Sequence, residues 1–409
     1  MSLAPVLTSI DRGRLLALLI KELRDFALAE DALQEAYVSA LDHWPRGIPA
    51  NPQAWLLQVA RRKAIDKIRR ASNWRSKRGE LEYLVKLDQD APELRENGAI
   101  PDERLRLIFT CCHPALDKQA SVALTLRTLC GLTTEEIARA FVVPREAMAQ
   151  RLVRVQRKIA KAGIPYEVPE QSQWPDRIEA VLTVIYLIFN EGYASSSRDY
   201  MRADLCAEAI RLAELLCGFL PGEPEPTGLL ALMLLHRARF DTRTGADGVP
   251  VALEDQDRSR WGRARIANAT AMLERALRLG RPGAYQLQAA IAAIHCEAKS
   301  FAETGWREIV LIYDRLLEIT PNPVITLNRI VALSYAEGAA PALAALAAIE
   351  QDLQAYQPFH AAKADLLSRA WRTTEAAEAY RRAISISSSP AEKQFLERRL
   401  KALTLVRTA

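Results

Sequence analysis

The sequence has little glycine and no run of alternating apolar residues that would predict a β-strand. It contains 17 glycines among 409 residues and is rich in alanine and leucine, a composition that favours helix. Its longest apolar run, around 181–189, is far shorter than the roughly 20 residues that a membrane span requires. The N-terminus lacks the basic and apolar segments of a signal peptide. We therefore expect an all-α protein of about two to four domains, located in the cytoplasm and without a membrane partner.

The cysteines predict neither a disulfide framework nor a metal site. There are six, no two of them form a CxxC pair, and most lie within apolar helical patterns. Such thiols are typical of a reducing compartment. The run Cys111-Cys112-His113 has the wrong spacing for paired zinc ligands. We expect no metal and no cofactor.

Positive charge is concentrated at the front of the chain. Residues 1–165 carry 27 lysines and arginines against 20 acidic residues, whereas the remainder carries 28 against 30. Between positions 61 and 78 there are nine basic residues and one acidic residue, Asp66. A helix face with one sign of charge predicts a polyanion opposite it, although a solvated basic helix without a ligand is the alternative. The asymmetry predicts a front half that binds nucleic acid and a back half that binds protein.

The segment 54–70, AWLLQVARRKAIDKIRR, combines one apolar helical stripe with an almost purely basic face. It resembles the region of bacterial sigma factors that melts and reads the promoter −10 element, and most closely that of the extracytoplasmic-function subfamily. In that family the loop before this helix, here 44–53, takes a base flipped out of the duplex. Trp55 lies on the apolar stripe, so we expect it in the core rather than as a stacking platform. The resemblance implies DNA contacts by Arg61, Arg62, Lys63, Lys67, Arg69 and Arg70.

The helix predicted at 29–44, AEDALQEAYVSALDHW, has an apolar stripe that includes Tyr37 and Leu41. In the sigma family this helix carries the main docking surface for the clamp helices of the RNA polymerase β′ subunit. The resemblance assigns that contact to Asp31, Gln34 and Glu35. A solvated acidic face is the alternative.

Residues 101–163 predict a second DNA-binding module of the helix-turn-helix type. Thr134 is the expected N-cap of its first helix, 141–143 the turn, and Pro144 the opening of the next helix. The module resembles sigma region 4, which reads the −35 element, and the resemblance implies contact with the polymerase β flap. Many relatives have a small residue near the position of Pro144. The base preference of those relatives therefore cannot be transferred to this chain. The buried stripe of the second helix should consist of Met148, Leu152, Val155 and Ile159. The DNA-facing residues should be Arg145, Glu146, Ala149, Gln150, Arg151, Arg154, Arg157 and Lys158.

The back half predicts a helical repeat. The pattern around Tyr313 recurs 67 residues later around Tyr380, and Gly338 marks a turn between them. A period near 34 is typical of tetratricopeptide repeats, which bind a peptide or protein partner; an array that packs only on itself is the alternative. The segment FTCCHPAL at 109–116 resembles the corresponding segment of those sigma-family members that have a long C-terminal extension. The expected domains are region 2 at 1–72, a linker at 73–100, region 4 at 101–163 and the C-terminal domain at 176–409.

Two polar clusters, 189–200 and 247–261, resemble segments shared by this extended group. We expect Glu191, Asp255, Asp257 and Arg258 in them to make interdomain contacts. Without a nearby nucleophile they make a weak case for catalysis, and we expect no enzyme. The sequence thus predicts a sigma factor that brings core RNA polymerase to promoter DNA under the control of its own C-terminal domain. The alternative is a tetratricopeptide-type adaptor whose front half is an accessory DNA-binding part.

Overall fold

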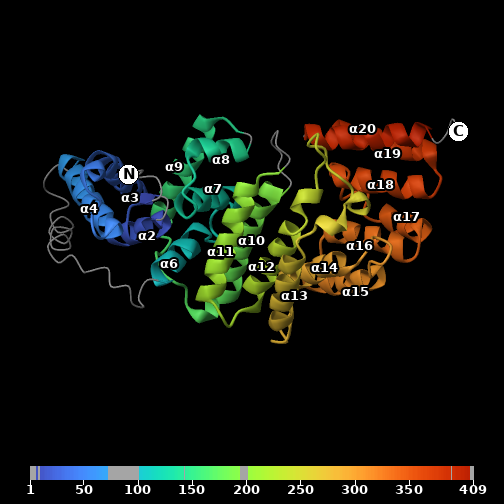
Figure 1. Cartoon of the computed structure of the whole chain (residues 1–409), viewed down its shortest axis with the longest axis horizontal. Coiled ribbons are helices and arrows are strands. Elements are labelled where there is room, and N and C mark those ends of the chain that lie inside the picture. Colours follow the sequence, from blue (N-terminus) through green and yellow to red (C-terminus); the bar gives the residue numbers. More distant parts are fainter. Residues whose placement is uncertain are drawn as a thin grey trace. The chain divides into compact units, whose positions relative to one another are not determined.

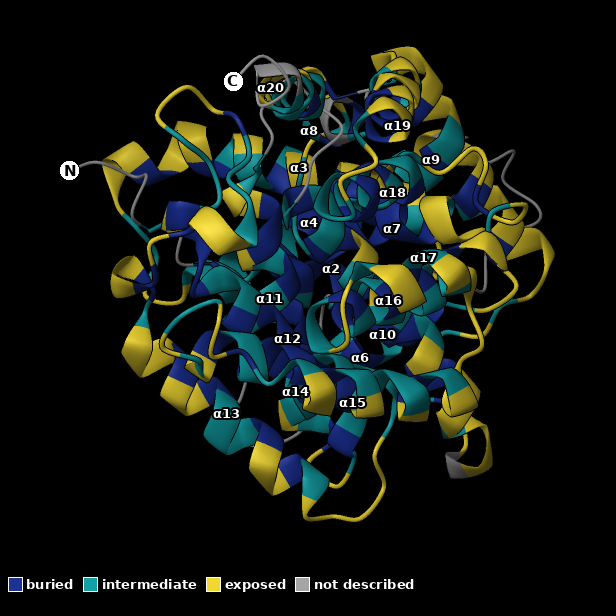
Figure 2. Cartoon of the chain, turned by 90° about the vertical axis from the view of Figure 1, so that its right-hand side faces the viewer, coloured by how far each residue is buried: buried dark blue, intermediate teal, exposed yellow. Residues whose placement is uncertain are grey.

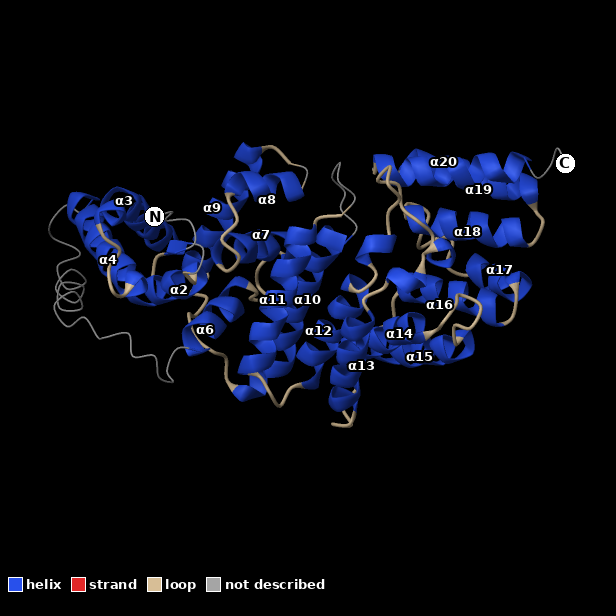
Figure 3. Cartoon of the chain, in the orientation of Figure 1, coloured by secondary structure: helices blue, strands red, loops and turns tan. Residues whose placement is uncertain are grey.

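The computed structural model describes residues 6–7, 10–71, 101–141, 143–193, 201–387 and 389–405, so the predicted linker at 73–100 lies outside the described residues. Within these ranges every regular element is helical, apart from one isolated β-bridge between Thr244 and Pro250 (Figure 3). The prediction of an all-α fold is confirmed. No helix in these ranges is both long and apolar enough to cross a membrane.

The chain divides into two compact units, 1–184 and 185–409. The division falls inside α10 (Trp174–Tyr193), later than the proline-rich segment at 163–175 where the sequence suggested a boundary. Part of that segment packs within unit 1, because the Tyr166 hydroxyl donates to the carbonyl of Ala17 at 2.8 Å. A boundary inside a helix means that the first turns of α10 complete unit 1.

Unit 1 contains two groups of helices (Figure 1). The first group consists of α2 (Arg12–Leu23), α3 (Phe26–His43), the short η1 (Trp44–Arg46) and α4 (Pro52–Ala71). The second consists of α6 (Pro101–Cys111), α7 (Lys118–Thr128), α8 (Thr134–Ala140) and α9 (Arg145–Lys161), followed by η2 (Gln171–Gln173) and the first part of α10. Aspartates begin several of these helices: Asp25 accepts from the Leu28 amide at 3.0 Å and Asp117 from the Ala120 amide at 3.1 Å.

An ion pair joins α4 to α2 inside the first group. The guanidinium of Arg61 donates from Nε to Glu22 Oε2 at 2.8 Å and from a terminal nitrogen to Glu22 Oε1 at 2.5 Å. The Arg61 side chain is 9% exposed and that of Glu22 is 11% exposed. Two parallel bonds of this kind fix both side chains and hold the two helices at one rotation.

A second set of ionic contacts joins the two groups of unit 1. Glu30 of α3 is almost buried and lies between Arg12 of α2, at 3.7 Å, and Arg127 of α7. Lys21 of α2 pairs with Glu103 of α6 at 2.6 Å. The described structure therefore holds the expected region 2 and region 4 together through charged side chains.

Unit 2 is a row of helices in which each packs on the next (Figure 1). Its elements after α10 are α11 (Ala203–Phe219), α12 (Pro224–Arg237), η3 (Phe240–Thr242), η4 (Leu253–Asp255), η5 (Arg258–Arg260), α13 (Arg263–Leu277), α14 (Ala284–Glu297), α15 (Trp306–Ile319), α16 (Pro323–Ala336), α17 (Ala339–Ala347), α18 (Gln357–Arg369), α19 (Thr373–Ile386) and α20 (Pro390–Leu405). Buried residues lie on the helix faces turned toward neighbours, and exposed residues on the outer faces (Figure 2). Because three-residue turns join some of these helices, such as α18 and α19, consecutive partners run antiparallel.

Helices α12 and α14 pack closely against each other in unit 2. The Glu225 carboxylate accepts the amides of Tyr285 at 2.9 Å and Gln286 at 3.0 Å, so α12 caps the N-terminus of α14. A Cβ at Gly228 would come within 2.8 Å of the Gln286 backbone nitrogen. The absence of a side chain at Gly228 is therefore what allows these two helices to meet.

We predict opposite effects of Gly→Ala changes at two helical positions of unit 2. Gly228→Ala should lower the free energy of unfolding by about 1–3 kcal/mol, because the new methyl group must push α14 away. Gly218→Ala on α11 should raise it by about 0.5–1 kcal/mol, because nothing lies within 4 Å of its Cβ and alanine is the better helix former. Urea unfolding of the two variants measures both effects. A stabilised Gly228→Ala variant would contradict the close approach of α12 and α14.

Candidate nucleic-acid interface

The basic residues of α4 differ in how far they are exposed. Arg62, Arg69 and Arg70 are exposed, Lys63 is half-buried and Arg61 is buried. The apolar face of the helix is buried through Leu56, Leu57, Ala60, Ala64 and Ile65. Because that face fixes the rotation of α4, the exposed basic side chains lie on its outer surface, where a nucleic-acid backbone can approach them.

Arg61 belongs to the interior of unit 1, and the prediction that it contacts DNA is contradicted by its burial. Its guanidinium is turned toward Glu22 of α2 and is engaged there in two hydrogen bonds. A phosphate could reach it only if α4 moved away from α2. The sequence of the basic run at 61–63 did not indicate that Arg61 is buried, because its partner Glu22 lies on another helix.

Lys67 forms a triad with two residues that the sequence assigned to a different surface. Its Nζ lies 3.1 Å from Asp31 Oδ2 and 2.9 Å from Glu35 Oε1, both on α3. Burial alone would lower the pKa of Lys67, but the hydrogen bonds to Glu35 and Asp31 outweigh it and raise the pKa. Lys67, which was expected to bind DNA, therefore pairs with Asp31 and Glu35, which were expected to bind polymerase. The pairing lies where the outer faces of α3 and α4 meet.

The outer face of α3 is a mixed polar and apolar stripe. Asp31 and Gln34 are exposed and Glu35 is partly exposed. On the same face Val38 is 54% exposed and Leu41 is 52% exposed. Leu41 belongs to the predicted apolar stripe of this helix, but it is exposed and not buried. The sequence indicated no role for Val38. The spacing 31, 34, 35, 38 and 41 was visible in the sequence as one helical face and could have indicated both residues.

The loop before α4 is closed by two tryptophans. Trp44 is buried in η1, and Trp55 of α4 lies edge-on to it with ring centroids 5.5 Å apart. Trp55 is itself half-buried. This geometry agrees with Trp55 as a packing residue between the loop and the helix.

The helices α8 and α9 have the expected lengths and the expected core. Met148, Leu152, Val155 and Ile159 of α9 are all buried, which confirms the predicted stripe. The cap of α8 lies one residue earlier than predicted: Thr133, rather than Thr134, accepts from the Glu136 amide at 3.2 Å. In return the Thr133 amide donates to Glu136 Oε2 at 2.7 Å. This reciprocal pair is a capping box.

The side chains predicted to face DNA are on the outer side of α9. Arg145, Glu146, Ala149, Gln150, Arg154 and Arg157 are all exposed. Arg151 is partly covered and lies over the Phe141 ring, 6.0 Å from its centroid. Lys158 is exposed but donates from Nζ to the Ala115 carbonyl at 2.5 Å. Exposed polar side chains therefore lie along the whole length of α9.

The thiols at 111–112 pack as buried apolar groups. Cys111 Sγ lies 3.3 Å from the Thr128 hydroxyl, and Cys112 Sγ lies 3.6 Å from that of Thr125. Burial raises the pKa of Cys112 to about 12, so it is a neutral thiol and a poor metal ligand at neutral pH. No group of histidine, cysteine and carboxylate side chains in the described ranges could hold a metal ion.

The residues proposed for interdomain contact have mostly local partners within unit 2. Asp257 accepts from the Ser259 amide at 3.0 Å, and Arg258 is buried and donates to the carbonyls of His295 at 2.6 Å and Ala298 at 2.9 Å. Arg258 thus binds the C-terminal end of α14. Asp255 is exposed and Glu191 is half-buried.

Comparison with known proteins supports parts of the sequence interpretation. Residues 11–74 match the family described as sigma-70 region 2, which includes α3 and α4. Residues 177–277 match a family of unknown function, DUF6596. The chain is 27% identical to the extracytoplasmic-function RNA polymerase sigma factor SigK of Mycobacterium sp. strain KMS and of strain JLS, over 31% of this chain and 65% of SigK.

A much longer match links the chain to a protein without an assigned role. It is 44% identical to the uncharacterized protein R00370 of Rhizobium meliloti, over 95% of this chain and 93% of that protein. No solved structure matches the chain. The chain therefore belongs to the same family as R00370, and its residues 11–74 are similar to sigma-70 region 2.

Proposed function

We propose that this chain is a sigma factor of the extracytoplasmic-function type, which directs core RNA polymerase to specific promoters in the cytoplasm and starts transcription. The observation that carries the proposal is the pairing of two outer faces in the sigma-70 region 2 segment: a mixed stripe on α3 and a basic face on α4. An adaptor that only binds DNA has no need of the α3 stripe.

The α3 stripe would bind the β′ clamp helices of core polymerase. Val38 and Leu41 supply exposed apolar area, which gains free energy when a partner covers it, and Asp31, Gln34 and Glu35 supply polar contacts at the rim. Lys67 would oppose this binding. A partner that binds the carboxylates of Asp31 and Glu35 must compete with the ammonium group of Lys67, which pairs with both.

The outer face of α4 would hold the DNA backbone around the −10 element. Arg62, Lys63, Arg69 and Arg70 are the residues that we assign to it, and Arg61 is left out because it is buried. Arginine and lysine on phosphate provide affinity and position without selecting bases. Base selection at this element would come from the loop at 44–53.

The helix α9 would read the −35 element, with the module also touching the β flap. We assign base contacts to Arg145, Gln150 and their neighbours Glu146 and Ala149 at the start of the helix, where all four are exposed. Arg154 and Arg157, farther along, would contact phosphate. Lys158 must release the Ala115 carbonyl to do so.

The back half would control this activity in cis through a tetratricopeptide-like domain that also takes a peptide or protein partner. Support comes from the row of antiparallel helices in unit 2 and from its covalent continuity with unit 1 through α10. A tethered domain acts at high effective concentration, so even weak contacts could change promoter use.

Changing Leu41 to Arg should weaken binding of the full-length chain to core polymerase by about tenfold or more, which corresponds to about 1.4 kcal/mol. The change removes exposed apolar area from the α3 stripe and leaves the core untouched. Leu311→Arg is the matched control, because Leu311 is an exposed leucine on α15 of unit 2. Affinity measured by fluorescence anisotropy with labelled protein, together with circular dichroism, separates binding from folding. Equal affinity of both variants would place the docking surface elsewhere.

Replacing Arg62, Arg69 and Arg70 by Gln should flatten the salt dependence of promoter binding by the holoenzyme. Each lost phosphate contact removes roughly 0.7 to 0.9 from the slope of log K against log salt. Arg61→Gln is the contrast, since it should leave the slope unchanged but lower the free energy of unfolding by about 3–5 kcal/mol through the unpaired Glu22. An unchanged slope in the triple variant, or a flattened one in Arg61→Gln with normal stability, would contradict the assignment.

A chain that ends at Val184 keeps the whole of unit 1 and tests control in cis. We expect it to give clearly less transcript than the full-length chain in run-off transcription, compared at equal occupancy of core polymerase, because unit 2 is proposed to support activity. Circular dichroism and the unfolding midpoint of the shorter chain show whether unit 1 remains folded. Equal yields from a folded shorter chain would remove the case for control in cis.

A further inference from the structure

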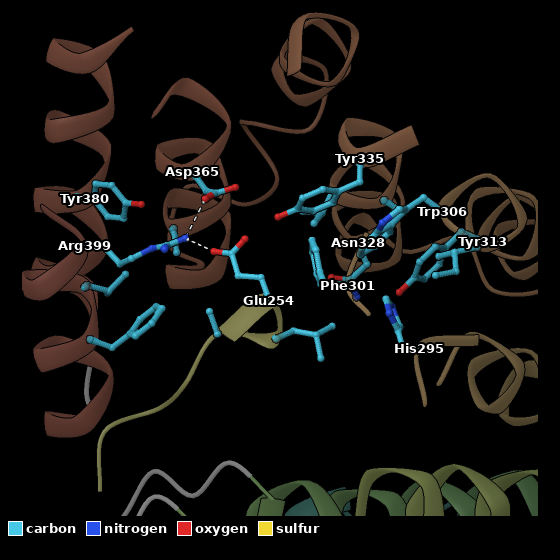
Figure 4. Close-up of a pocket in the computed structure, with 18 residues that line it drawn as sticks. Glu254, His295, Phe301, Trp306, Tyr313, Asn328, Tyr335, Asp365, Tyr380 and Arg399 are labelled. Carbon is cyan, nitrogen blue, oxygen red and sulfur yellow. Dashed lines mark hydrogen bonds and ion pairs between the residues drawn. The ribbon is translucent and has the colours of Figure 1, made fainter. Parts of the chain in front are cut away.

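The inner side of unit 2 contains a hollow of about 290 Å³ with one aromatic wall (Figure 4). Trp306 of α15 stacks on Tyr335 of α16 with ring centroids 4.5 Å apart, and Phe301 meets the edges of both rings at 5.1 Å. A preformed wall of this kind offers a large apolar area in fixed orientation. It is suited to one bulky apolar side chain of a ligand.

The opposite side of the hollow is charged. Arg399 of α20 donates to Glu254 Oε1 at 3.0 Å and to Asp365 Oδ1 at 3.2 Å (Figure 4). Asp365 belongs to α18, whereas Glu254 comes from outside the helices α15 to α20. Arg369, which pairs with Asp365 at 3.1 Å, does not line the hollow and lies over the Tyr335 ring, 4.1 Å from its centroid.

Glu254 reaches the hollow from η4, at the tip of the loop that joins α12 to α13. The base of that loop is fixed: the Val251 amide donates to the Arg243 carbonyl at 2.8 Å, and the buried Gln256 side chain donates to the Val251 carbonyl at 3.1 Å. The tip itself, 252–255, is held in two ways: Leu253 packs against the core cluster of α12 to α14, and Glu254 pairs with Arg399 of α20, both side chains being about one-third exposed. A partly exposed ion pair contributes little free energy, so another carboxylate can replace Glu254.

We propose that the tip is an internal ligand of this hollow, and that an extended segment of a partner protein, with an aromatic residue directly before a glutamate, binds there in its place. The glutamate would take over Arg399, which the tip has shown to accept a carboxylate in this position. The aromatic side chain would fill the space beside Trp306 that Leu253 and Ala252, which both line the hollow, leave open. Partner binding would then release the tip at 252–255 while the base of the loop stays fixed, and this gives unit 2 a structural response to its partner.

The loop has a second attachment that the same exchange would weaken. Arg398, next to Arg399 on α20, pairs with Asp247 at 2.6 Å, again between exposed side chains. The two neighbouring arginines thus hold the loop at two points along its length. Loss of one point leaves the other alone, so displacement of Glu254 should increase the mobility of the loop tip at 252–255.

The test uses two fluorescein-labelled peptides and the full-length chain. One peptide copies residues 250–257, PVALEDQD, and the other carries Phe in place of Leu, PVAFEDQD. Glu254→Gln should bind the Phe peptide about fivefold or more tightly than the unchanged protein does, because the internal competitor is weakened. The Phe peptide should also bind more tightly than the Leu peptide. Arg399→Gln added to Glu254→Gln should abolish that gain, whereas Arg382→Gln, an exposed arginine on α19, should leave it intact.

Three results would overturn the proposal. The first is failure of the Glu254→Gln variant to bind either peptide. The second is that adding Arg399→Gln to this variant leaves peptide affinity and the unfolding midpoint unchanged. The third is tighter binding of the Leu peptide than of the Phe peptide. If the unchanged chain instead forms a dimer by light scattering and Glu254→Gln abolishes that dimer, the occupant is the loop of a second copy and the partner assignment is wrong. Hydrogen exchange of 247–261 with and without the Phe peptide reports release of the loop tip directly.

Discussion

The described residues of this chain form no sheet, so every helix among them must bury one face against neighbouring helices, and that constraint decides which charged groups remain for a partner. In α4 the buried face is apolar, yet its edge includes Arg61, which is satisfied by Glu22 from α2. A buried guanidinium without such a partner would cost several kcal/mol. The basic helix therefore offers fewer side chains to DNA than its sequence suggests, and those that it offers lie on one side.

Some charged side chains that remain exposed belong to both the outer face of α3 and the outer face of α4. Lys67 lies between Asp31 and Glu35, so the outer faces of α3 and α4 meet at a triad of one ammonium group and two carboxylates. Glu30, a neighbour of Asp31 in sequence, is instead drawn inward between Arg12 and Arg127. Such paired charges are easily exchanged for those of a partner when exposed and are held firmly when buried. A sigma factor that must bind polymerase and DNA in sequence can use both kinds.

Unit 2 follows the same constraint with a different outcome. A row of antiparallel helices buries its faces pairwise and leaves an inner side lined by Trp306, Tyr335 and Arg399. Glu254, delivered by a loop, occupies part of that side. The polar cluster at 247–261 thus has two roles in the structure: Arg258 binds the end of α14, while Glu254 at the loop tip binds Arg399 of α20.

The sequence by itself determined the all-α class, the apolar stripes of α4 and α9 and the resemblance to region 2, because helical periodicity and local motifs are properties of neighbouring residues. Only the tertiary structure decided which basic residues are exposed, that Leu41 faces outward, and that Arg258 is a buried helix cap. Each of these depends on a helix distant in sequence; Glu22, for example, lies 39 residues before Arg61. The hollow in unit 2 could not be predicted at all, since its wall and its charged side come from separate helices and a loop that only the packing of the whole row brings together.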